Sequence, residues 1–156
     1  MKLFEETGIL SHREAEARHE IMLETYVKKI QIEARIMGDL AINHILPAAV
    51  KYQTELSRNV ESLKAIGLSK DAYDTQVEMI KEISNHISVI RKKVNEMIEA
   101  RKKANRMENI RNKAIAYCDL VKPYFDIIRD HADHLEMIVD DEMWPMAKYR
   151  ELVNIR

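Results

Sequence analysis

Apolar residues recur every three or four positions along almost the whole of this 156-residue chain. This spacing places them on one face of an α-helix, whereas a half-buried strand would need strict alternation. Only three Gly and three Pro interrupt the pattern, and both residue types are poorly tolerated inside helices. The sequence therefore predicts an all-α fold in a single domain, an antiparallel bundle of three long helices followed by a short C-terminal helical turn.

The first long helix is expected over residues 11–66. Ser11 and Glu14 have the spacing of a capping box, in which each side chain satisfies a backbone N–H at the start of a helix. The apolar seam of this helix consists of Leu23, Val27, Ile30, Ala34, Met37, Ala41, Ile45, Ala48, Tyr52, Leu56, Val60 and Leu63. Pro47 interrupts the seam, and because proline lacks a backbone N–H and clashes with the carbonyl four residues earlier, we expect a kink there.

Two further helices are expected over residues 69–104 and 107–139. The seam of the second has a strict heptad spacing and consists of Ile80, Ile83, Ile87, Ile90, Val94 and Met97. The seam of the third consists of Ile110, Ala114, Tyr117, Val121, Tyr124, Ile128, His131, Leu135 and Ile138. The phase slips by one residue between the two seams, which indicates a turn near 103–108. A single helix through 70–139 remains an alternative, because no Gly or Pro enforces the turn.

An aromatic tail is expected over residues 143–156. Pro145 is suited to the first turn of a short helical element, which we expect to continue through 148–152. The only Trp of the chain, Trp144, lies here with Tyr149 outside the bundle seams, a pattern typical of an aromatic anchor on another protein surface. In the alternative interpretation, Trp144 folds back and caps the open end of the bundle.

The expected helices differ in length. At about 1.5 Å per residue, the first would be roughly 80 Å long and the other two roughly 50 Å. The two shorter helices would lie along the C-terminal half of the first, so its first turns would lack a partner within the chain. The predicted docking or regulatory contacts are therefore Met22, Leu23 and Tyr26 on these turns, and Trp144, Tyr149, Arg150 and Glu151 in the tail.

No catalytic, cofactor-binding or metal site is predicted. A di-iron bundle needs two Glu-x-x-His pairs facing each other, and only Glu16 and His19 have that spacing. His131 and His134 lie on one helix face beside Asp130 and Asp133. These polar side chains could hold a surface metal ion. We interpret them as solvated, because a bound ion needs three or four converging ligands.

Three other reactive side chains are interpreted as structural. His44 and His86 lie on or beside the seams and are expected to be hydrogen-bonded core histidines. Cys118 follows a seam residue, with no helix N-terminus nearby to lower its pKa, so we expect a packed thiol and not a nucleophile.

Charge and cysteine usage limit the partners and the compartment. The formal net charge of −1 provides no general attraction to nucleic acid or to a membrane surface. A basic cluster between Arg91 and Lys113 is interleaved with glutamates, which is typical of a solvated face. The single cysteine cannot form an intramolecular disulfide, and no apolar run is long enough for a signal peptide core or a membrane span. We therefore expect a soluble, cytoplasmic protein.

Several sequence motifs resemble the C-terminal region of type III glutamine synthetases, the large bacterial form. In the first half these motifs are Ser11-His12-Arg13-Glu14, Ile32-Glu33-Ala34-Arg35, Gly38-Asp39, Asn43-His44-Ile45-Leu46-Pro47-Ala48-Ala49 and Lys51-Tyr52-Gln53. In the second half they are Ile83-Ser84-Asn85-His86-Ile87, Asn95-Glu96-Met97-Ile98-Glu99-Ala100-Arg101, Val121-Lys122-Pro123-Tyr124-Phe125, Val139-Asp140-Asp141-Glu142-Met143-Trp144-Pro145 and Tyr149-Arg150-Glu151-Leu152. The likeness spans nearly the whole chain in order, and helical periodicity alone would not produce the motif around Trp144.

The resemblance implies a parent enzyme several times longer, an oligomer that makes glutamine from glutamate, ammonia and ATP with Mg or Mn. The catalytic residues of that family have no counterpart in this sequence, so the chain resembles an excised C-terminal domain with a structural, assembly or regulatory role. Its expected partners are the catalytic body of the parent chain and neighbouring subunits of a homo-oligomer. The alternative is a free-standing helical-bundle interaction protein, which would require a gene that ends at both of these termini.

Overall fold

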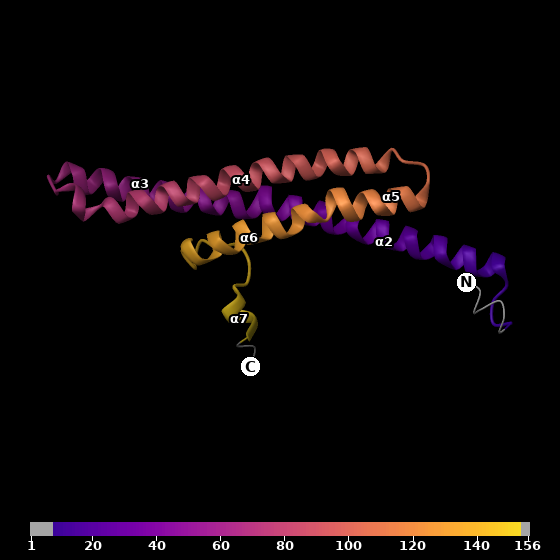
Figure 1. The fold of residues 1–156 in the computed structure, drawn as a ribbon. Coiled ribbons are helices and arrows are strands. Elements are labelled where there is room, and N and C mark those ends of the chain that lie inside the picture. Colours follow the sequence, from indigo (N-terminus) through magenta and orange to yellow (C-terminus); the bar gives the residue numbers. More distant parts are fainter. Residues whose placement is uncertain (1–7, 154–156) are drawn as a thin grey trace.

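The structure, a computed structural model, describes residues 8–153, and every regular element in that range is helical (Figure 1). The first rod is continuous and comprises α2 (His12–Leu40), a π-helical turn η1 (Ala41–Ile45) and α3 (Leu46–Ala65). A short 3-10 turn η2 (Lys70–Ala72) leads into α4 (Asp74–Asn105). The third rod comprises α5 (Ile110–Ala116), a second π-helical turn η3 (Tyr117–Val121) and α6 (Pro123–Ile138), and the short α7 (Tyr149–Val153) follows. The predicted fold class, an antiparallel bundle of three long helices with a short C-terminal turn, is confirmed.

The capping box at the start of α2 is present. The Glu14 N–H donates to Oγ of Ser11 at 3.3 Å, and the Ser11 N–H donates to Oε2 of Glu14 at 2.8 Å. Each side chain thus satisfies a backbone donor that the first helical turn leaves without an intrahelical partner. This local exchange fixes the start of the helix at His12.

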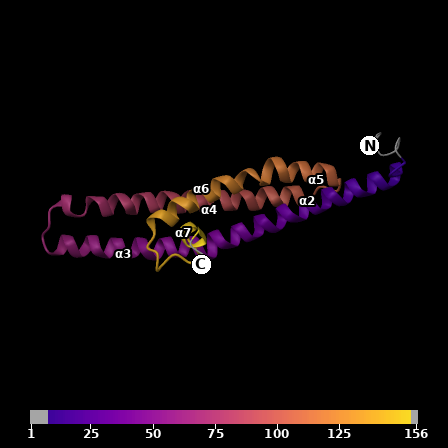
Figure 2. The same cartoon turned by 90° about the horizontal axis from the view of Figure 1, so that it is seen from below.

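The kink near Pro47 takes the form of the π-helical turn η1. One extra residue is accommodated before the proline, and the Leu46 N–H donates to the carbonyl of Ala41, five residues earlier. The rod changes direction between α2 and α3 (Figure 2). The same arrangement recurs in the third rod, where the Lys122 N–H donates to the Tyr117 carbonyl at 3.0 Å and Pro123 begins α6. The second π-helical turn is absent from the sequence-based prediction.

The second and third rods are separate helices, so the alternative of one helix through 70–139 is wrong. The turn between them lies between Asn105 and Ile110. Asn109 caps α5, because its Oδ1 accepts the Asn112 N–H at 3.0 Å. The turn is also bridged by the buried Tyr117, whose hydroxyl donates to Oδ1 of Asn105 at 2.7 Å. The side chain of Asn109 therefore caps the start of α5, and that of Asn105 connects the end of α4 to Tyr117, without Gly or Pro in the turn.

The core lies along α4. Four of its seam residues, Ile83, Ile90, Val94 and Met97, are at most 1 % exposed. The buried residues of the third rod that join them in one cluster are Ala114, Ala116, Tyr117, Val121, Ile128 and Leu135. The first rod contributes Val27, Ile30, Ala34, Ala41, Ile45, Leu46 and Ala49. The residues of all three predicted seams are buried or partly buried, as their spacing predicts.

The three rods are not aligned at their ends. The N-terminal turns of α2 extend beyond the turn that joins α4 to α5, while the tip between α3 and α4 extends beyond α6 at the other end (Figures 1 and 2). The hairpin tip exposes Ile66 and Leu68, which are 72 % and 45 % exposed. The bundle is three helices thick only in its middle.

Two local expectations at the π-helical turns are wrong. His44 is exposed, because the π-helical turn directs Ala41 and Ile45 to the core and leaves His44 beside them on the outer side. Cys118 is exposed, because the buried positions of its turn are Tyr117 and Val121.

The last helix does not begin at Pro145, which lies in the loop before α7. The side chain of Asp140 stabilises a turn at this point, since its Oδ1 accepts the Glu142 N–H at 2.8 Å. The short helix that we expected to start at Pro145 starts instead four residues later, at Tyr149.

Candidate functional site

Helix α2 carries a second apolar face on the side opposite the core. We define the outer stripe as Ile21, Thr25, Ile32 and Ile36. Ile21 and Ile32 are eleven residues apart, as are Thr25 and Ile36, and eleven residues correspond to about three helical turns. The three isoleucines are 62 %, 57 % and 53 % exposed. A helix with one apolar face needs one partner, whereas α2 has an apolar face on each side.

The predicted contacts near the start of α2 separate into two groups. Met22 is 70 % exposed. Leu23 and Tyr26 are partly buried against the core, where they line a shallow groove between α2 and α5 with Ala114, Ile115 and Cys118. Burial, followed by the hydrogen bond with Cys118, raises the pKa of Tyr26 above its ordinary value. Leu23 and Tyr26 therefore pack against α5. The sequence analysis expected these first turns of α2 to lack a partner within the chain.

In the tail, Trp144 is 7 % exposed and belongs to the core cluster. Its Nε1 is buried and has no hydrogen-bond partner among the described residues. Glu151 caps the short helix α7, because its carboxylate accepts the Lys148 N–H at 3.1 Å. The side chains of Tyr149 and Arg150 lie outside the described part of the structure. In this chain Trp144 folds back on the bundle, which is the second of the two interpretations considered for it.

Lys148 fastens the tail to the end of α6. Its Nζ donates to the carbonyls of Glu136 at 2.7 Å and Val139 at 3.0 Å, and it pairs with the carboxylate of Asp141 at 2.5 Å. The residue is 9 % exposed. A cation at this position complements the partial negative charge of the last carbonyls of α6. The sequence contains no signal for this role, since Lys148 lies in an irregular loop.

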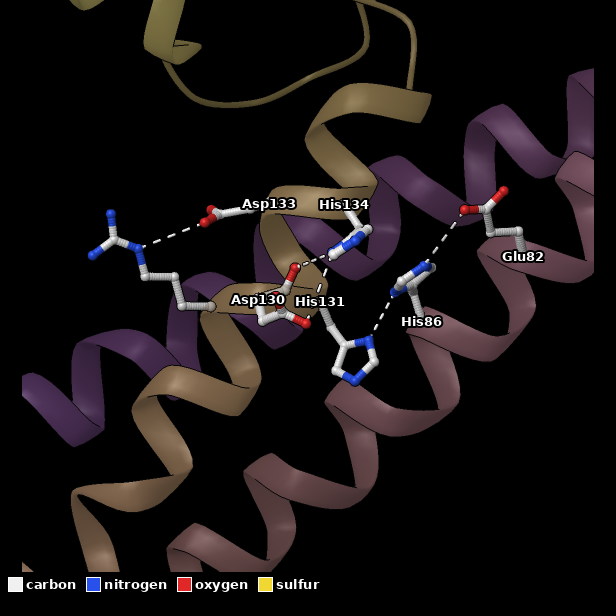
Figure 3. Close-up of polar contacts among 7 residues, drawn as sticks. Glu82, His86, Asp130, His131, Asp133 and His134 are labelled. Atoms are coloured by element: carbon white, nitrogen blue, oxygen red, sulfur yellow. Dashed lines mark hydrogen bonds and ion pairs between the residues drawn. The ribbon is translucent and has the colours of Figure 1, made fainter.

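Three histidines converge where α4 faces α6 (Figure 3). Nδ1 of His86 lies 2.8 Å from Nδ1 of His131. The ring of His134 stacks on that of His86, with centroids 5.2 Å apart and an interplanar angle of 18°. Nε2 of His86 faces Oε1 of Glu82 at 3.9 Å. The expectation that His86 is a hydrogen-bonded core histidine is confirmed, and the structure adds that its partners are the pair that we interpreted as solvated.

The short contact between the two rings limits how they can be protonated. The two Nδ1 atoms can form a hydrogen bond only if one carries a proton and the other does not. Either ring can be the donor in the neutral pair, depending on the tautomer. Burial, with the charges of His131 and His134 as the next causes, lowers the pKa of His86 below its ordinary value. The neutral form of His86 is therefore favoured at this position.

The donor set does not fit a divalent metal site. No group of three or more His, Cys, Asp or Glu side chains within residues 8–153 is placed to hold a metal ion. His86 and His131 form a hydrogen bond with each other, and the Nδ1 of His134 is directed at the backbone carbonyl of Asp130 at 2.7 Å.

Within residues 8–153, no helix combines the length and apolarity needed to cross a bilayer.

Comparison with known proteins gives consistent matches. A family model described as the glutamine synthetase C-terminal domain matches residues 1–64. A glutamine synthetase of Bacteroides fragilis (strain YCH46) is 50 % identical over 149 residues, which are 93 % of this chain and 20 % of that protein. A type-3 glutamine synthetase of Dictyostelium discoideum is 32 % identical over 159 residues, covering 100 % of this chain and 22 % of that protein. A glutamine synthetase of Butyrivibrio fibrisolvens is 26 % identical over 151 residues, covering 97 % of this chain and 21 % of that protein. The chain spans about a fifth of the length of these curated relatives.

Proposed function

The chain carries a glutamine synthetase C-terminal domain, and from this premise we propose that it is a structural and assembly element of a longer glutamine synthetase. In this proposal the longer enzyme joins ammonia to glutamate with ATP and a divalent metal, and that chemistry takes place outside these residues. The bundle packs on the catalytic body of its own polypeptide or of a neighbouring subunit in a homo-oligomer.

The outer stripe of α2 carries the proposal. Full burial of one isoleucine contributes about 1.5–3 kcal/mol, and Ile21, Ile32 and Ile36 are each more than half exposed in the chain alone. Covering the stripe would therefore contribute several kcal/mol to docking, before the entropy cost of association is subtracted. The relatives are about five times longer than the matched stretch, so a polypeptide that could cover the stripe is available in the proposed parent.

The position of the stripe supports the same occupant. α5 packs on the inner face of α2, where Leu23 and Tyr26 line the groove between the two helices. The stripe lies on the opposite face, on the part of α2 that the other two rods leave accessible. A surface of the parent enzyme can reach it without displacing any helix of the bundle.

A chimera tests the proposal. The matching stretch of the Bacteroides fragilis relative is replaced by this chain, and the mass of the assembled particle and the rate of glutamine formation are measured. We expect the chimera to assemble and to form glutamine, and a deletion of the stretch to lose assembly. A deletion that assembles and turns over like the chimera would refute a structural role.

The double variant Ile32→Glu, Ile36→Glu in the chimera identifies the docking face. Both positions are exposed in the chain alone, so the isolated domain should keep its helicity and its unfolding midpoint, while the chimera should dissociate. The matched control is Ile66→Glu, which is 72 % exposed at the hairpin tip and should leave assembly unchanged. If the double variant assembles as well as the control, the outer stripe is not the docking face.

A second candidate is regulation by the tail. α7 stands away from the bundle (Figure 1), and its Leu152 and Val153 are 55 % and 84 % exposed, so it could contact an active-site entrance. Truncation of the chimera after Lys148 removes α7 and retains the contacts of Lys148 with α6. An altered KM or kcat with unchanged particle mass would support gating, and unchanged kinetics with unchanged mass would refute it.

A further inference from the structure

We propose that the histidine cluster formed by His86, His131 and His134 is a pH-sensitive joint, which holds α6 against α4 when its rings are neutral and loosens that contact when a second ring is protonated. This inference concerns the isolated bundle and does not depend on the proposed docking. It assigns a conformational role to the core histidine His86 and to His131 and His134, which first suggested a surface metal site.

The short contact between the two Nδ1 atoms limits the number of protons. At 2.8 Å the His86 and His131 rings share one hydrogen, donated by one ring to the bare nitrogen of the other. If both rings are protonated, each Nδ1 carries a hydrogen, and the hydrogen bond is replaced by a contact between two donors. The like charges then also repel each other, because the ring centroids are only 5.0 Å apart.

The third ring adds to this repulsion. His134 stacks on His86 at 5.2 Å, and its Nδ1 is directed at the carbonyl of Asp130 at 2.7 Å, which fixes the orientation of the ring. A proton on His134 therefore places its charge directly over the His86 ring. His86 is 7 % exposed, whereas the side chain of His134 is 45 % exposed. Solvent therefore screens part of the repulsion from His134, and the close contact between His86 and His131 carries most of the effect.

The neighbouring carboxylates offset the repulsion between protonated rings only weakly. Glu82 from α4 is 3.9 Å from Nε2 of His86 with a side chain 53 % exposed, and Asp130 from α6 is 3.8 Å from Nδ1 of His134 with a side chain 67 % exposed. Asp133, also on α6, pairs with Arg129 at 3.7 Å. Solvent screens carboxylates at such distances and exposures.

Two further elements packed on α4, namely α3 and η1, present little opposing charge near the cluster. α3 faces α4 with Gln53, an uncharged amide that donates to the Ile80 carbonyl and to Oγ of Ser84. The charged residues next to Gln53 in sequence, Lys51 and Glu55, are exposed. The titratable side chain of η1, His44, is exposed as well.

The direction of the pH effect follows from proton binding. Because the folded state lowers the pKa of His86, the unfolded or opened state binds more protons at mildly acidic pH. The stability contribution of the joint is complete above the ordinary histidine pKa of about 6.5 and is lost as the pH falls below it. Opening would expose Ile83, Ile90, Ile128 and Leu135, which are buried on either side of the cluster.

Urea unfolding of the full chain at pH 7.5 and 5.5 tests the joint. For each proton that the folded state excludes, the unfolding equilibrium constant should rise by up to about tenfold between these pH values. His86→Gln retains a hydrogen-bonding side chain that cannot be protonated. The rise of its unfolding equilibrium constant between the two pH values should therefore be smaller than that of the wild type by up to about tenfold. His44→Gln is the matched control at an exposed position and should retain the wild-type pH dependence. A full wild-type pH dependence in His86→Gln would overturn the proposal.

A second measurement on the unmodified chain covers the case in which His86→Gln does not fold. NMR titration of the histidine ring protons should give His86 a midpoint below the ordinary histidine value of about 6.5. The hydrogen-exchange protection factors, which correct for the slower intrinsic exchange at lower pH, should fall more in α6 than in α3 as the pH falls. An ordinary midpoint for His86, or an equal loss of protection in α6 and α3, would also overturn the proposal.

Discussion

Replacement of Lys148 by Met should release the tail while leaving the bundle folded. Methionine retains the apolar stem and removes the ammonium group that donates to the carbonyls of Glu136 and Val139 and pairs with Asp141. Hydrogen bonds of charged groups contribute about 1.5–3 kcal/mol each. Allowing for rehydration of the carbonyls in the opened state, we expect the loss to cost the docked tail about 2–4 kcal/mol.

This loss is large relative to what else holds the tail. Burying a Trp removes about 150–250 Å² from water, which at about 25 cal/mol per Å² is about 4–6 kcal/mol. Trp144 offsets part of that gain because its buried Nε1 has no hydrogen-bond partner among the described residues, at a cost of about 1–3 kcal/mol. Ordering the loop before α7 subtracts further free energy. Lys148 is therefore expected to decide whether the tail stays docked.

The fluorescence of Trp144, the only Trp in the chain, reports this directly. In Lys148→Met the emission should shift to longer wavelength and become accessible to acrylamide, while the far-UV circular dichroism stays nearly unchanged. Lys102→Met is the control, since Lys102 forms an exposed pair with Glu99 far from the tail in sequence. Unchanged emission and quenching in Lys148→Met would refute the role assigned to the ammonium group.

Further predictions concern the core and the surface. Ile90→Ala removes a side chain that is 0 % exposed and should lower the free energy of unfolding, measured with urea, by about 2–5 kcal/mol; a loss below 1 kcal/mol would contradict the packing. Tyr117→Phe removes the hydrogen bond to Asn105 and should cost about 0.5–1.5 kcal/mol in the same assay, and no loss would mean that the bond is not formed. Cys118 is exposed, so it should react with a thiol reagent in native buffer nearly as fast as in urea, and slow native reaction would show that it is covered.

The long-range architecture could be predicted from the sequence because the bundle depends on repetition. The heptad that contains Ile83 and Ile90 determines which side of α4 faces the core, and both residues are completely buried. The one-residue phase slip correctly indicates the break near Asn105. Ser11 and Glu14 form the predicted capping box because that motif needs only residues within one turn.

The positions that periodicity did not place correctly lie at the π-helical turns. Each such turn inserts one residue, so the seam continues in a new phase after Ala41 and after Tyr117. His44 and Cys118 lie within these turns, and this explains why both are exposed although they adjoin the seams. Pro123 within the third seam was an available signal, equivalent to Pro47 in the first, since a proline inside a helical pattern requires a local rearrangement.

The candidate sites depend on contacts between distant segments, which a periodic pattern does not specify. The outer stripe could have been found, because Ile21, Ile32 and Ile36 share one face opposite the seam. The pairing of His86 with His131 requires the register of α4 against α6, and the role of Lys148 requires the path of the loop. Neither is encoded by local spacing.

The most direct test of the account is whether the outer stripe of α2 is covered in the longer enzyme. Ile32→Cys is introduced into the isolated chain and into the chimera, each in a Cys118→Ser background, and the rate of reaction with a maleimide is measured. Ile66→Cys provides the reference for an exposed position that stays accessible. We predict at least a tenfold slower reaction at position 32 in the chimera than in the isolated chain, with equal rates at position 66. Equal rates at position 32 would contradict the claim that this face docks on the rest of the enzyme.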